Sequence, residues 1–556
     1  MSLQGVPVIV LGKDSKRTQG RDAMNSNITA VLAVAELLKS SLGPRGMDKM
    51  LVDSLGDVTI TNDGAEIVNK IETSHPAAKI VIQTAKSQDS EAGDGTTSVV
   101  VMTGELLKKA KDLLDKGIHP SVIVNGYKKA TEEAIKYLHE IAIPINGDVE
   151  AIKKVAMTTM NSKVVSASRD VLADLIVKAV TTIAEEKDGK PYVNLDYVKI
   201  VKKEGASISA SQLINGVVLD KEIGHSDMPR KVKNAKILLL NVPIEIEKTE
   251  YDANIRIESP EDMFLFKKQE EKMIEQMVEK IAKTGANVVL SQKNISDLAL
   301  YFMAKKGIVA VKRVSKNDMK RISKATGAKF VSNLDEIPAE SLGEAGLVEE
   351  RKIADSKFVF IENCKNPKAV TLFLRGGTKL VVEETERALH DALFVAKDTL
   401  EDDKIVVGGG AVEMKISQHI RKVAPKYTGR IQLVINAYAD ALEIIPKALA
   451  ENAGLDSVEL LTQLRKAHAD KDDWFGIDIY NAKMNDMYKQ NVFEPLRVKL
   501  QILTSSSEVA RLILRIDDVI ASKKKAPAPP GGGMGGMGGM GGMGGMGGMG
   551  GMPMGM

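Results

Sequence analysis

The stretch "QDSEAGDGTTSVVVMTGELLKKA", residues 88–110, places two glycines, a carboxylate and consecutive hydroxyls directly before a helical run of apolar residues. A helix N-terminus presents unpaired backbone N–H groups and the positive end of the helix dipole, so residues 93–97 are suited to binding a phosphate. Glycine allows the backbone to approach a ligand closely, and Thr96 and Thr97 add hydroxyl donors.

Asp94 in this stretch has two interpretations. A carboxylate repels phosphate, but it suits the site if Mg²⁺ lies between them, because Mg²⁺ is often held by a carboxylate together with substrate phosphates. The alternative is that Asp94 only caps the helix, which aspartate does well without a ligand. The motif alone favours neither interpretation.

Length and composition limit the class of protein. The 556 residues are too many for one core and predict roughly three or four domains. Lys and Arg number 77 against 74 Asp and Glu, so the net charge of +3 gives no general attraction to nucleic acid or an acidic membrane. A single cysteine, Cys364, excludes an internal disulfide. With no apolar run of about 18 residues and no signal peptide, these features predict a cytoplasmic protein.

The pattern along the chain predicts an α/β segment between two helical flanks. Residues 23–142 read mainly as helices, with a β-hairpin around Ser54 to Asp57. From about residue 217, the β-rich runs "AKILLLNV", "ANVVLSQ", "GIVAVKRV" and "AKFVSNL" alternate with amphipathic helices, which is typical of a separate α/β domain. "TLFLR", residues 371–375, marks its end, and helical character then returns as far as "EPLRVKLQIL". The two flanks are therefore able to form one domain.

Residues 526–556 form a tail, in which a Pro-rich hinge is followed by a Gly-Gly-Met repeat. We expect this tail to be disordered, because the entropy lost on ordering its glycines exceeds what the thioethers regain. It is either a solubilising tail or a mobile apolar segment that adapts to varied surfaces.

Three further glycine turns accompany "GDGTT": "SSLGPRGMDKML" at 40–51, "TNDGAEI" at 61–67 and "VVGGGAVEM" at 406–414. Singly they are ordinary turns and helix caps. Together, "LGPRGMDKML", "TNDGA", "GDGTTS", "VVGGGAVE" and "EPLRVK" resemble the nucleotide-binding signature of the chaperonins. Residues 235–263 resemble the segment that leads into the built-in lid of group II chaperonins, the class of archaeal thermosomes and the eukaryotic cytosolic chaperonin. The Gly-Gly-Met tail is more similar to that of the bacterial class.

The resemblance implies a multidomain α+β fold. A mainly helical, split equatorial ATPase domain and a small, split intermediate domain would surround an inserted α/β apical domain with a helical lid. The implied limits are 1–147 and 406–525 for the equatorial domain, 148–216 and 371–405 for the intermediate domain, 217–370 for the apical domain and about 245–275 for the lid.

The resemblance also implies a site for ATP and Mg²⁺. Asp94 would bind the metal. The implied nucleotide-binding residues are Gly95, Thr96, Thr97 and Ser98 at the phosphates, Leu42, Gly43 and Pro44 along the phosphate and nucleoside, Gly409, Gly410 and Glu494 at the ribose with Lys499 nearby, and Ser162 and Lys163 at the γ-phosphate.

Asp63 and Asp391 are the implied catalytic pair, because two carboxylates are able to orient and deprotonate a water opposite a metal-bound phosphate. Each has a simpler interpretation. Asp63 suits a turn or a helix N-cap, and Asp391 lies one helical turn after Arg387, as in an ordinary surface ion pair. Spacing does not separate these interpretations, whereas the resemblance favours catalysis.

The function implied by the resemblance is an ATP-dependent chaperone. Stacked rings of this chain or of paralogous subunits would bind unfolded or partly folded proteins and enclose them with the built-in lid, without a separate co-chaperonin, nucleic acid or membrane. One alternative is a small-molecule phosphotransferase, for which no acceptor residues stand out. Another is an RNA-binding scaffold, which is weak because the tail lacks arginine and aromatic residues.

Residues 259–281, "SPEDMFLFKKQEEKMIEQMVEKI", predict a helix with Ser259 as cap and Pro260 at its first position. One face is predicted to be buried: Met263, Phe266, Met273, Ile274, Met277 and Ile281. Phe264 and Leu265 point away from that face, so we expect both to be exposed as a contact surface.

Overall fold

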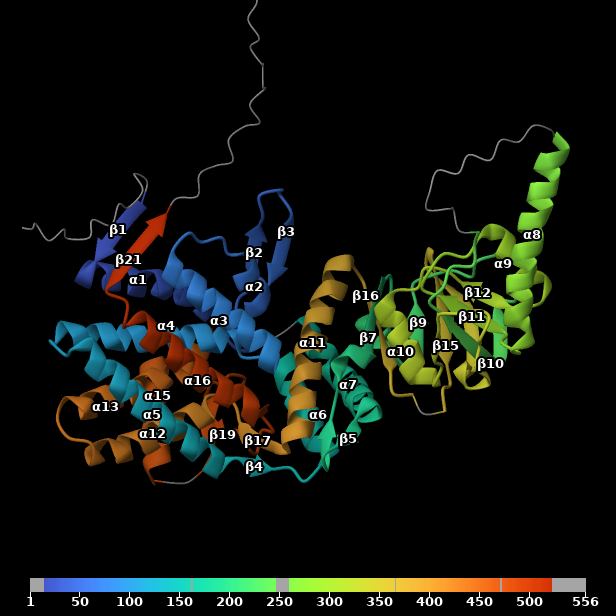
Figure 1. The fold of residues 1–556 in the computed structure, drawn as a ribbon. Coiled ribbons are helices and arrows are strands. Elements are labelled where there is room, and N and C mark those ends of the chain that lie inside the picture. The colour runs from blue at the N-terminus through green and yellow to red at the C-terminus, as the bar shows by residue number, and fades with distance from the viewer. Residues whose placement is uncertain (1–14, 162–163, 247–259, 366, 471–472, 523–556) are drawn as a thin grey trace, which may run out of the picture.

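The computed structural model describes residues 15–161, 164–246, 260–365, 367–470 and 473–522, and these residues form three bodies in a row (Figure 1). A helical body lies at one end, a smaller body lies in the middle, and an α/β body lies at the other end. Each body has its own main hydrophobic core. No helix in these ranges combines the length and the apolarity needed to cross a membrane. The Gly-Gly-Met tail, 526–556, falls outside the described residues.

The helical body is built from both ends of the described chain. Its elements from the first flank are β1 (Ser15–Gln19), α1 (Gly20–Lys39), β2 (Lys49–Val52), β3 (Val58–Thr61), α2 (Gly64–Lys70), α3 (Pro76–Ala92), α4 (Thr96–Asp115), α5 (Pro120–Ile141) and β4 (Ile143–Pro144). Those from the second flank are β17 (Lys404–Val407), α12 (Ala411–Val423), α13 (Arg430–Leu442), α14 (Ile444–Asn452), α15 (Ser457–Asp470), β18 (Phe475–Asp478), β19 (Lys483–Asp486), β20 (Phe493–Pro495), α16 (Leu496–Ile513) and β21 (Asp518–Ser522).

A shared core and two sheets join these flanks. Leu106, Tyr438 and Ile513, from α4, α13 and α16, are fully or almost fully buried in one core. β17 pairs antiparallel with both β4 and β20, and β1 pairs antiparallel with β21 near the two ends of the described chain. The prediction that the helical flanks belong together therefore agrees with the packing.

The middle body consists of helices around a three-stranded sheet. Its elements are α6 (Val149–Met160), α7 (Arg169–Ile183), β5 (Glu185–Lys187), β6 (Lys190–Tyr192), β7 (Val198–Glu204), β8 (Gln212–Ile214), β16 (Val370–Gly376) and α11 (Lys379–Asp402). β16 pairs parallel with β7 and antiparallel with β8. The "TLFLR" run is thus a strand of this middle sheet and not the last strand of the α/β body.

Helix α11 links the middle body to the helical body. At its C-terminal end, Arg497 of α16 donates to Asp398 at 2.8 Å and to Asp402 at 2.9 Å. Asp398 is completely buried, so this ion pair is shielded from solvent far better than one on the surface. The pair fixes the end of the helix that carries Asp391.

The α/β body is organised around a mixed seven-stranded sheet. Its strands follow the order β12-β11-β10-β14-β15-β9, and β13 also pairs with β10. Its elements are β9 (Gly216–Leu219), β10 (Lys231–Leu240), α8 (Pro260–Lys283), β11 (Val288–Ser291), α9 (Asp297–Lys305), β12 (Val309–Val311), α10 (Lys316–Thr326), β13 (Phe330–Val331), β14 (Gly343–Ile353) and β15 (Ser356–Glu362). The predicted β-rich runs correspond to β10, β11, β12 and β13. The antiparallel hairpin of β14 and β15 was not predicted.

Helix α8 begins at Pro260 as predicted and extends beyond the sheet (Figure 1). Its C-terminal half is anchored by Ile274, Val278 and Ile281, which are buried. Phe264 and Leu265 are 66% and 62% exposed, which confirms that prediction. The predicted burial of Met263, Phe266 and Met273 is wrong. All three are exposed, because the body covers α8 only from Ile274 onward and the earlier part of the helix projects away from it. Residues 247–259 of the predicted lid fall outside the described residues.

Helix α4 packs closely against α1. A Cβ added to Gly104 in α4 would overlap the Cβ of Ala35 in α1. Gly104 therefore allows the two helices to lie closer than an alanine would.

We predict that Gly104→Ala lowers the denaturant midpoint of unfolding. Alanine improves helix propensity by about 1 kcal/mol, but overpacking against Ala35 costs about 1–3 kcal/mol. Adding Ala35→Gly should recover part of the loss, because it removes the overlapping methyl group. Equal or higher stability of Gly104→Ala would show that the contact does not limit the spacing of the helices.

Candidate nucleotide site

The loop between α3 and α4 leaves the first backbone N–H groups of α4 without a side-chain cap. Its N-cap residue is Gly95, which has a left-handed backbone with φ 83°. Gln88 Nε2 of α3 donates to the Asp94 carbonyl at 2.8 Å and so holds the loop in place. A Cβ at Gly95 would lie 2.8 Å from Ile502 Cδ1. Glycine suits this position because of its left-handed backbone, and a larger residue would also have to displace the end of the Ile502 side chain.

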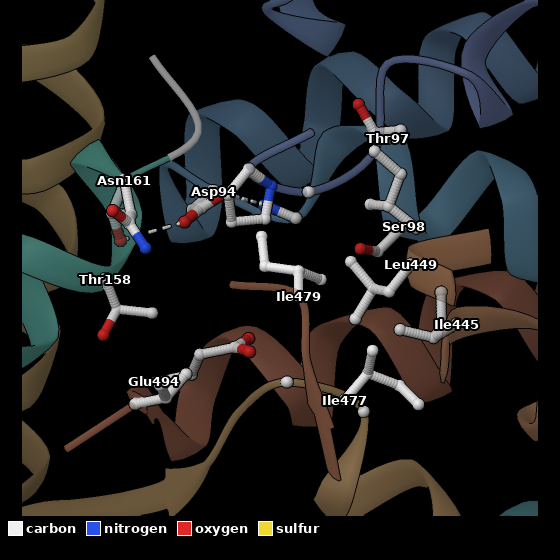
Figure 2. A pocket seen from close by; sticks show the side chains of 18 of the residues that line it. Asp94, Thr97, Ser98, Thr158, Asn161, Ile445, Leu449, Ile477, Ile479 and Glu494 are labelled. Atoms are coloured by element: carbon white, nitrogen blue, oxygen red, sulfur yellow. Dashed lines mark hydrogen bonds between the residues drawn. The ribbon is translucent and has the colours of Figure 1, made fainter. Parts of the chain in front are cut away.

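Asp94 does not act as the N-cap of α4, so the simple capping interpretation is wrong. Its carboxylate accepts the Gly95 N–H at 2.6 Å and the Thr159 hydroxyl at 3.1 Å. Thr159 belongs to α6 of the middle body, so this carboxylate lies where two bodies meet. Asp94 also lines a pocket, close to Asn161 (Figure 2).

The pocket gathers the sequence-predicted site residues in one place. Its volume is about 370 Å³, within the range usual for small-molecule sites. It is lined by every predicted site residue that the structure describes: Leu42, Gly43, Pro44, Asp63, Asp94, Gly95, Thr96, Thr97, Ser98, Asp391, Gly409, Gly410, Glu494 and Lys499. Ser162 and Lys163 fall outside the described residues.

The pocket has an apolar patch beside the start of α4. Ile445, Leu449 and Ile477 lie together, with Ser98 of the first turn of α4 next to Leu449, whereas Asp94, Thr158 and Glu494 lie on the other side of the view (Figure 2). Such a pocket suits a ligand that combines an apolar part with polar or anionic groups.

Sequence reasoning missed several lining residues. Thr158, Thr159 and Asn161 stand beside the predicted γ-phosphate loop, so their place in the chain was a usable signal. The residues at the turn from β18 to β19 carried no recognisable motif: Ile477, Asp478, Ile479 and Tyr480. Asp478 stabilises that turn by accepting the backbone N–H groups of Tyr480 and Asn481.

Asp63 caps a helix and also lines the pocket. It is the N-cap of α2 and accepts the Glu66 N–H at 3.2 Å, and it also lines the pocket. A carboxylate has two oxygens and several lone pairs, so capping does not exclude a second contact.

Asp391 is not part of an exposed surface pair. It is 6% exposed and lines the pocket from α11. Arg387 donates to Glu384, one turn earlier, at 2.6 Å. The surface-pair interpretation of Asp391 is therefore wrong.

Glu494 and Lys499 form a buried charged group with Glu413. Lys499 Nζ lies 2.7 Å from Glu494 Oε2 and 2.6 Å from Glu413 Oε1. Burial lowers the pKa of Lys499, but the two carboxylates outweigh burial and raise it, so the ammonium stays charged. The positive charge of Lys499 is compensated by Glu413 and Glu494. Glu494 keeps a quarter of its side chain exposed toward the pocket.

The carboxylates that line the pocket fit a metal that shares its ligands with a phosphate. Within the described part of the chain, His, Cys, Asp and Glu side chains form no group of three or more that is arranged to hold a metal ion. Mg²⁺ needs no such group, since one or two carboxylates, phosphate oxygens and water complete its octahedron. Asp94 provides a suitable carboxylate next to the uncapped N–H groups.

Comparison with known proteins agrees with this geometry. The model of the TCP-1/cpn60 chaperonin family matches residues 34–524. The thermosome subunit beta of Archaeoglobus fulgidus is 53% identical over 533 residues, which cover 96% of this chain and 98% of that protein. The thermosome subunit of Methanopyrus kandleri is 52% identical over 521 residues, 94% of this chain and 96% of that protein. The chain therefore belongs to the TCP-1/cpn60 chaperonin family, in its group II class.

We predict that Gly95→Ala lowers ATP affinity at least about tenfold, because a Cβ at this φ must displace the start of α4 or Ile502. Gly117→Ala is a matched control, since Gly117 also has a positive φ but has open space around its Cβ position and lies at the other end of α4. Calorimetric titration with ATP and Mg²⁺ measures both variants. Equal affinity of Gly95→Ala and Gly117→Ala would contradict a role for the uncapped turn.

Proposed function

We propose that this chain binds ATP with Mg²⁺ in the pocket at the start of α4, hydrolyses it, and uses the cycle to fold other proteins inside a ring-shaped chamber. The observation that carries the proposal is the convergence of residues from distant parts of the chain on one pocket, beside an uncapped helix N-terminus. The membership of the chaperonin family supports the chaperone role. It does not favour the alternatives of a phosphotransferase or an RNA-binding scaffold.

The proposed roles follow the chemistry of the lining residues. Backbone N–H groups and hydroxyls of Thr96, Thr97 and Ser98 hold the phosphates, and Gly95 lets the phosphates approach the backbone closely. Glu494 accepts hydrogen bonds from the ribose hydroxyls, held in place by Lys499. The apolar side chains around Leu449 cover the base. Asp94 holds Mg²⁺, which when bound neutralises phosphate charge and polarises the γ-phosphate for attack.

The proposed hydrolysis uses Asp63 and Asp391 on one water molecule. The two carboxylates orient the water and accept its proton as the oxygen forms a bond to the γ-phosphorus. The bond between that phosphorus and the β,γ-bridging oxygen breaks, so ADP and phosphate leave. Positioning and charge, more than covalent chemistry, are what the protein supplies in this class of reaction.

The three bodies fit the proposed domains. The helical body is assigned to the equatorial domain, 1–147 and 406–525, and the middle body to the intermediate domain, 148–216 and 371–405. The α/β body is assigned to the apical domain, 217–370, with the lid at about 245–275. Asp391 then reaches the equatorial pocket from the intermediate domain, so movement of that domain would be coupled to hydrolysis.

Exposed strands of the helical body support assembly with further subunits. The hairpin of β2 and β3 stands out from the body in Figure 1 and exposes the apolar side chains of Met50, Val52, Leu55 and Val58. A two-stranded hairpin with exposed apolar residues is marginally stable alone, and its free edges are a template for pairing with another chain. We propose that other copies of this chain, or paralogous subunits, cover it in the ring.

The proposal predicts that ATP binding, but not hydrolysis, distinguishes the two kinds of carboxylate. Asp391→Ala should bind ATP and Mg²⁺ but hydrolyse ATP at least about a hundredfold more slowly, because the proposed phosphate and metal ligands lie elsewhere. Asp94→Ala should lose both binding and hydrolysis. Phosphate release and calorimetric ATP titration measure the two properties separately, and hydrolysis at the parent rate by Asp391→Ala would refute the role in water activation.

The exposed tip of α8 predicts a defect in client handling alone. Phe264→Ser with Leu265→Ser should keep ring assembly and ATP hydrolysis but reduce the refolding of a denatured client, since it removes an exposed apolar surface. The swap Phe264→Leu with Leu265→Phe is the control, because it keeps the tip apolar. Refolding yield and protease resistance of the ATP-bound state are the readouts, and parent-like values for the serine variant would exclude a working surface.

A further inference from the structure

Thr61 connects the segment of Asp63 to the helix of Asp391 through one hydroxyl. It is the last residue of β3 and is 2% exposed. Its Oγ1 accepts the Asp63 N–H at 3.0 Å. The same hydroxyl donates to Glu384 Oε2 on α11 at 3.3 Å. Two segments that are far apart in the sequence and belong to different bodies thus share a buried hydrogen bond.

Glu384 lies on the same face of α11 as Asp391, about two helical turns earlier. It is 3% exposed, and its Oε2 also accepts Arg387 Nε at 2.9 Å. Its Oε1 has no hydrogen-bond partner among the described residues. Burying such an oxygen destabilises the fold, and an apolar side chain would avoid that cost. The contacts of Oε2 are therefore the feature that explains a carboxylate at this position.

The hydrogen bonds of Thr61 to Asp63 and Glu384 influence where the pocket carboxylates lie, although neither Thr61 nor Glu384 lines the pocket. Thr61 and Glu384 are not among the described residues that line the pocket, whereas Asp63 and Asp391 are. Asp63 follows Thr61 by two residues, and its backbone N–H is held by the Thr61 hydroxyl. The position of α11 relative to β3 therefore sets the separation of the two pocket carboxylates.

We propose that Thr61 and Glu384 are positioning residues that hold Asp63 and Asp391 at the separation needed to orient the attacking water. The proposal rests on the proposed hydrolysis by that carboxylate pair. Small displacements of reacting groups reduce rates strongly, even when the displaced residue is remote from the bond being broken. Substrate binding, in contrast, depends on Gly95 to Ser98 and on Glu494, and within the described part of the chain no hydrogen bond joins these residues to Thr61 or Glu384.

The test is Thr61→Val, which replaces the hydroxyl with a methyl group. We expect kcat for ATP hydrolysis to fall about tenfold, the scale of one lost hydrogen bond to a charged group, with the Kd for ATP changed less than about twofold. Thr61→Ser keeps the hydroxyl and should restore most of kcat. Thr131→Val is the matched control: Thr131 is also buried and donates to the Tyr127 carbonyl at 2.8 Å, but it lies away from the pocket.

A second variant keeps the test decisive if Thr61→Val does not fold. Glu384→Gln removes the charge that Thr61 and Arg387 contact, and it should lower kcat with ATP affinity retained. If both single variants fold, Thr61→Val combined with Glu384→Gln should be little slower than either, because both break the same connection. Parent-like kcat, a loss of ATP affinity without a loss of kcat, or fully additive effects would each overturn the proposal.

Asp391→Ala separates this inference from the function on which it rests. If Asp391→Ala hydrolyses ATP normally, the carboxylate pair is not catalytic and the proposed function fails. If Asp391→Ala is inactive and Thr61→Val has parent-like kcat, only the positioning role is wrong. Elution of the assembled protein from a sizing column, measured for each variant, excludes loss of assembly as the cause of a change in kcat.

Discussion

The start of α4 is the constraint on which the rest of the site depends. Its first N–H groups have no side-chain cap, and its N-cap glycine is enclosed by Ile502 and Gln88. A side chain at Gly64 would overlap Thr97, so α2 also approaches this turn closely. Because unpaired donors are costly unless water or a ligand meets them, the pocket has to stay open in front of them. The first turn of α4 therefore has to be closely packed by its neighbours and, at the same time, open to the pocket at its N–H groups.

The middle body supplies further parts of the site. Thr159 of α6 donates to Asp94, and α11 brings Asp391 into the pocket. The buried pairing of Arg497 with Asp398 fixes the C-terminal end of α11, and the contact of Thr61 with Glu384 fixes the helix near its N-terminal end. The site is therefore complete only when the helical body and the middle body are correctly placed.

Much of the fold and the site was predictable, because glycine turns next to helices are strong local signals. The positions of Gly43, Gly95 and Gly410 in the pocket follow from such turns, with the resemblance assigning them to one site. The β14–β15 hairpin was not predicted, since its turn at Ala354 has a positive φ without the usual Gly or Asn. The exposure of Phe266 was missed because helical periodicity indicates which residues share a face and not how far the supporting body extends. Contacts such as Thr61 with Glu384 depend on packing between segments that no local pattern relates.

Electron microscopy of the purified full-length protein with Mg²⁺ and a non-hydrolysable ATP analogue tests the central claim most directly. The account predicts stacked rings in which every subunit holds the analogue in this pocket. Its phosphates should contact residues 95–98, and Asp63 and Asp391 should face the γ-phosphate from the two bodies. Single unassembled subunits, or an analogue bound away from the start of α4, would contradict it.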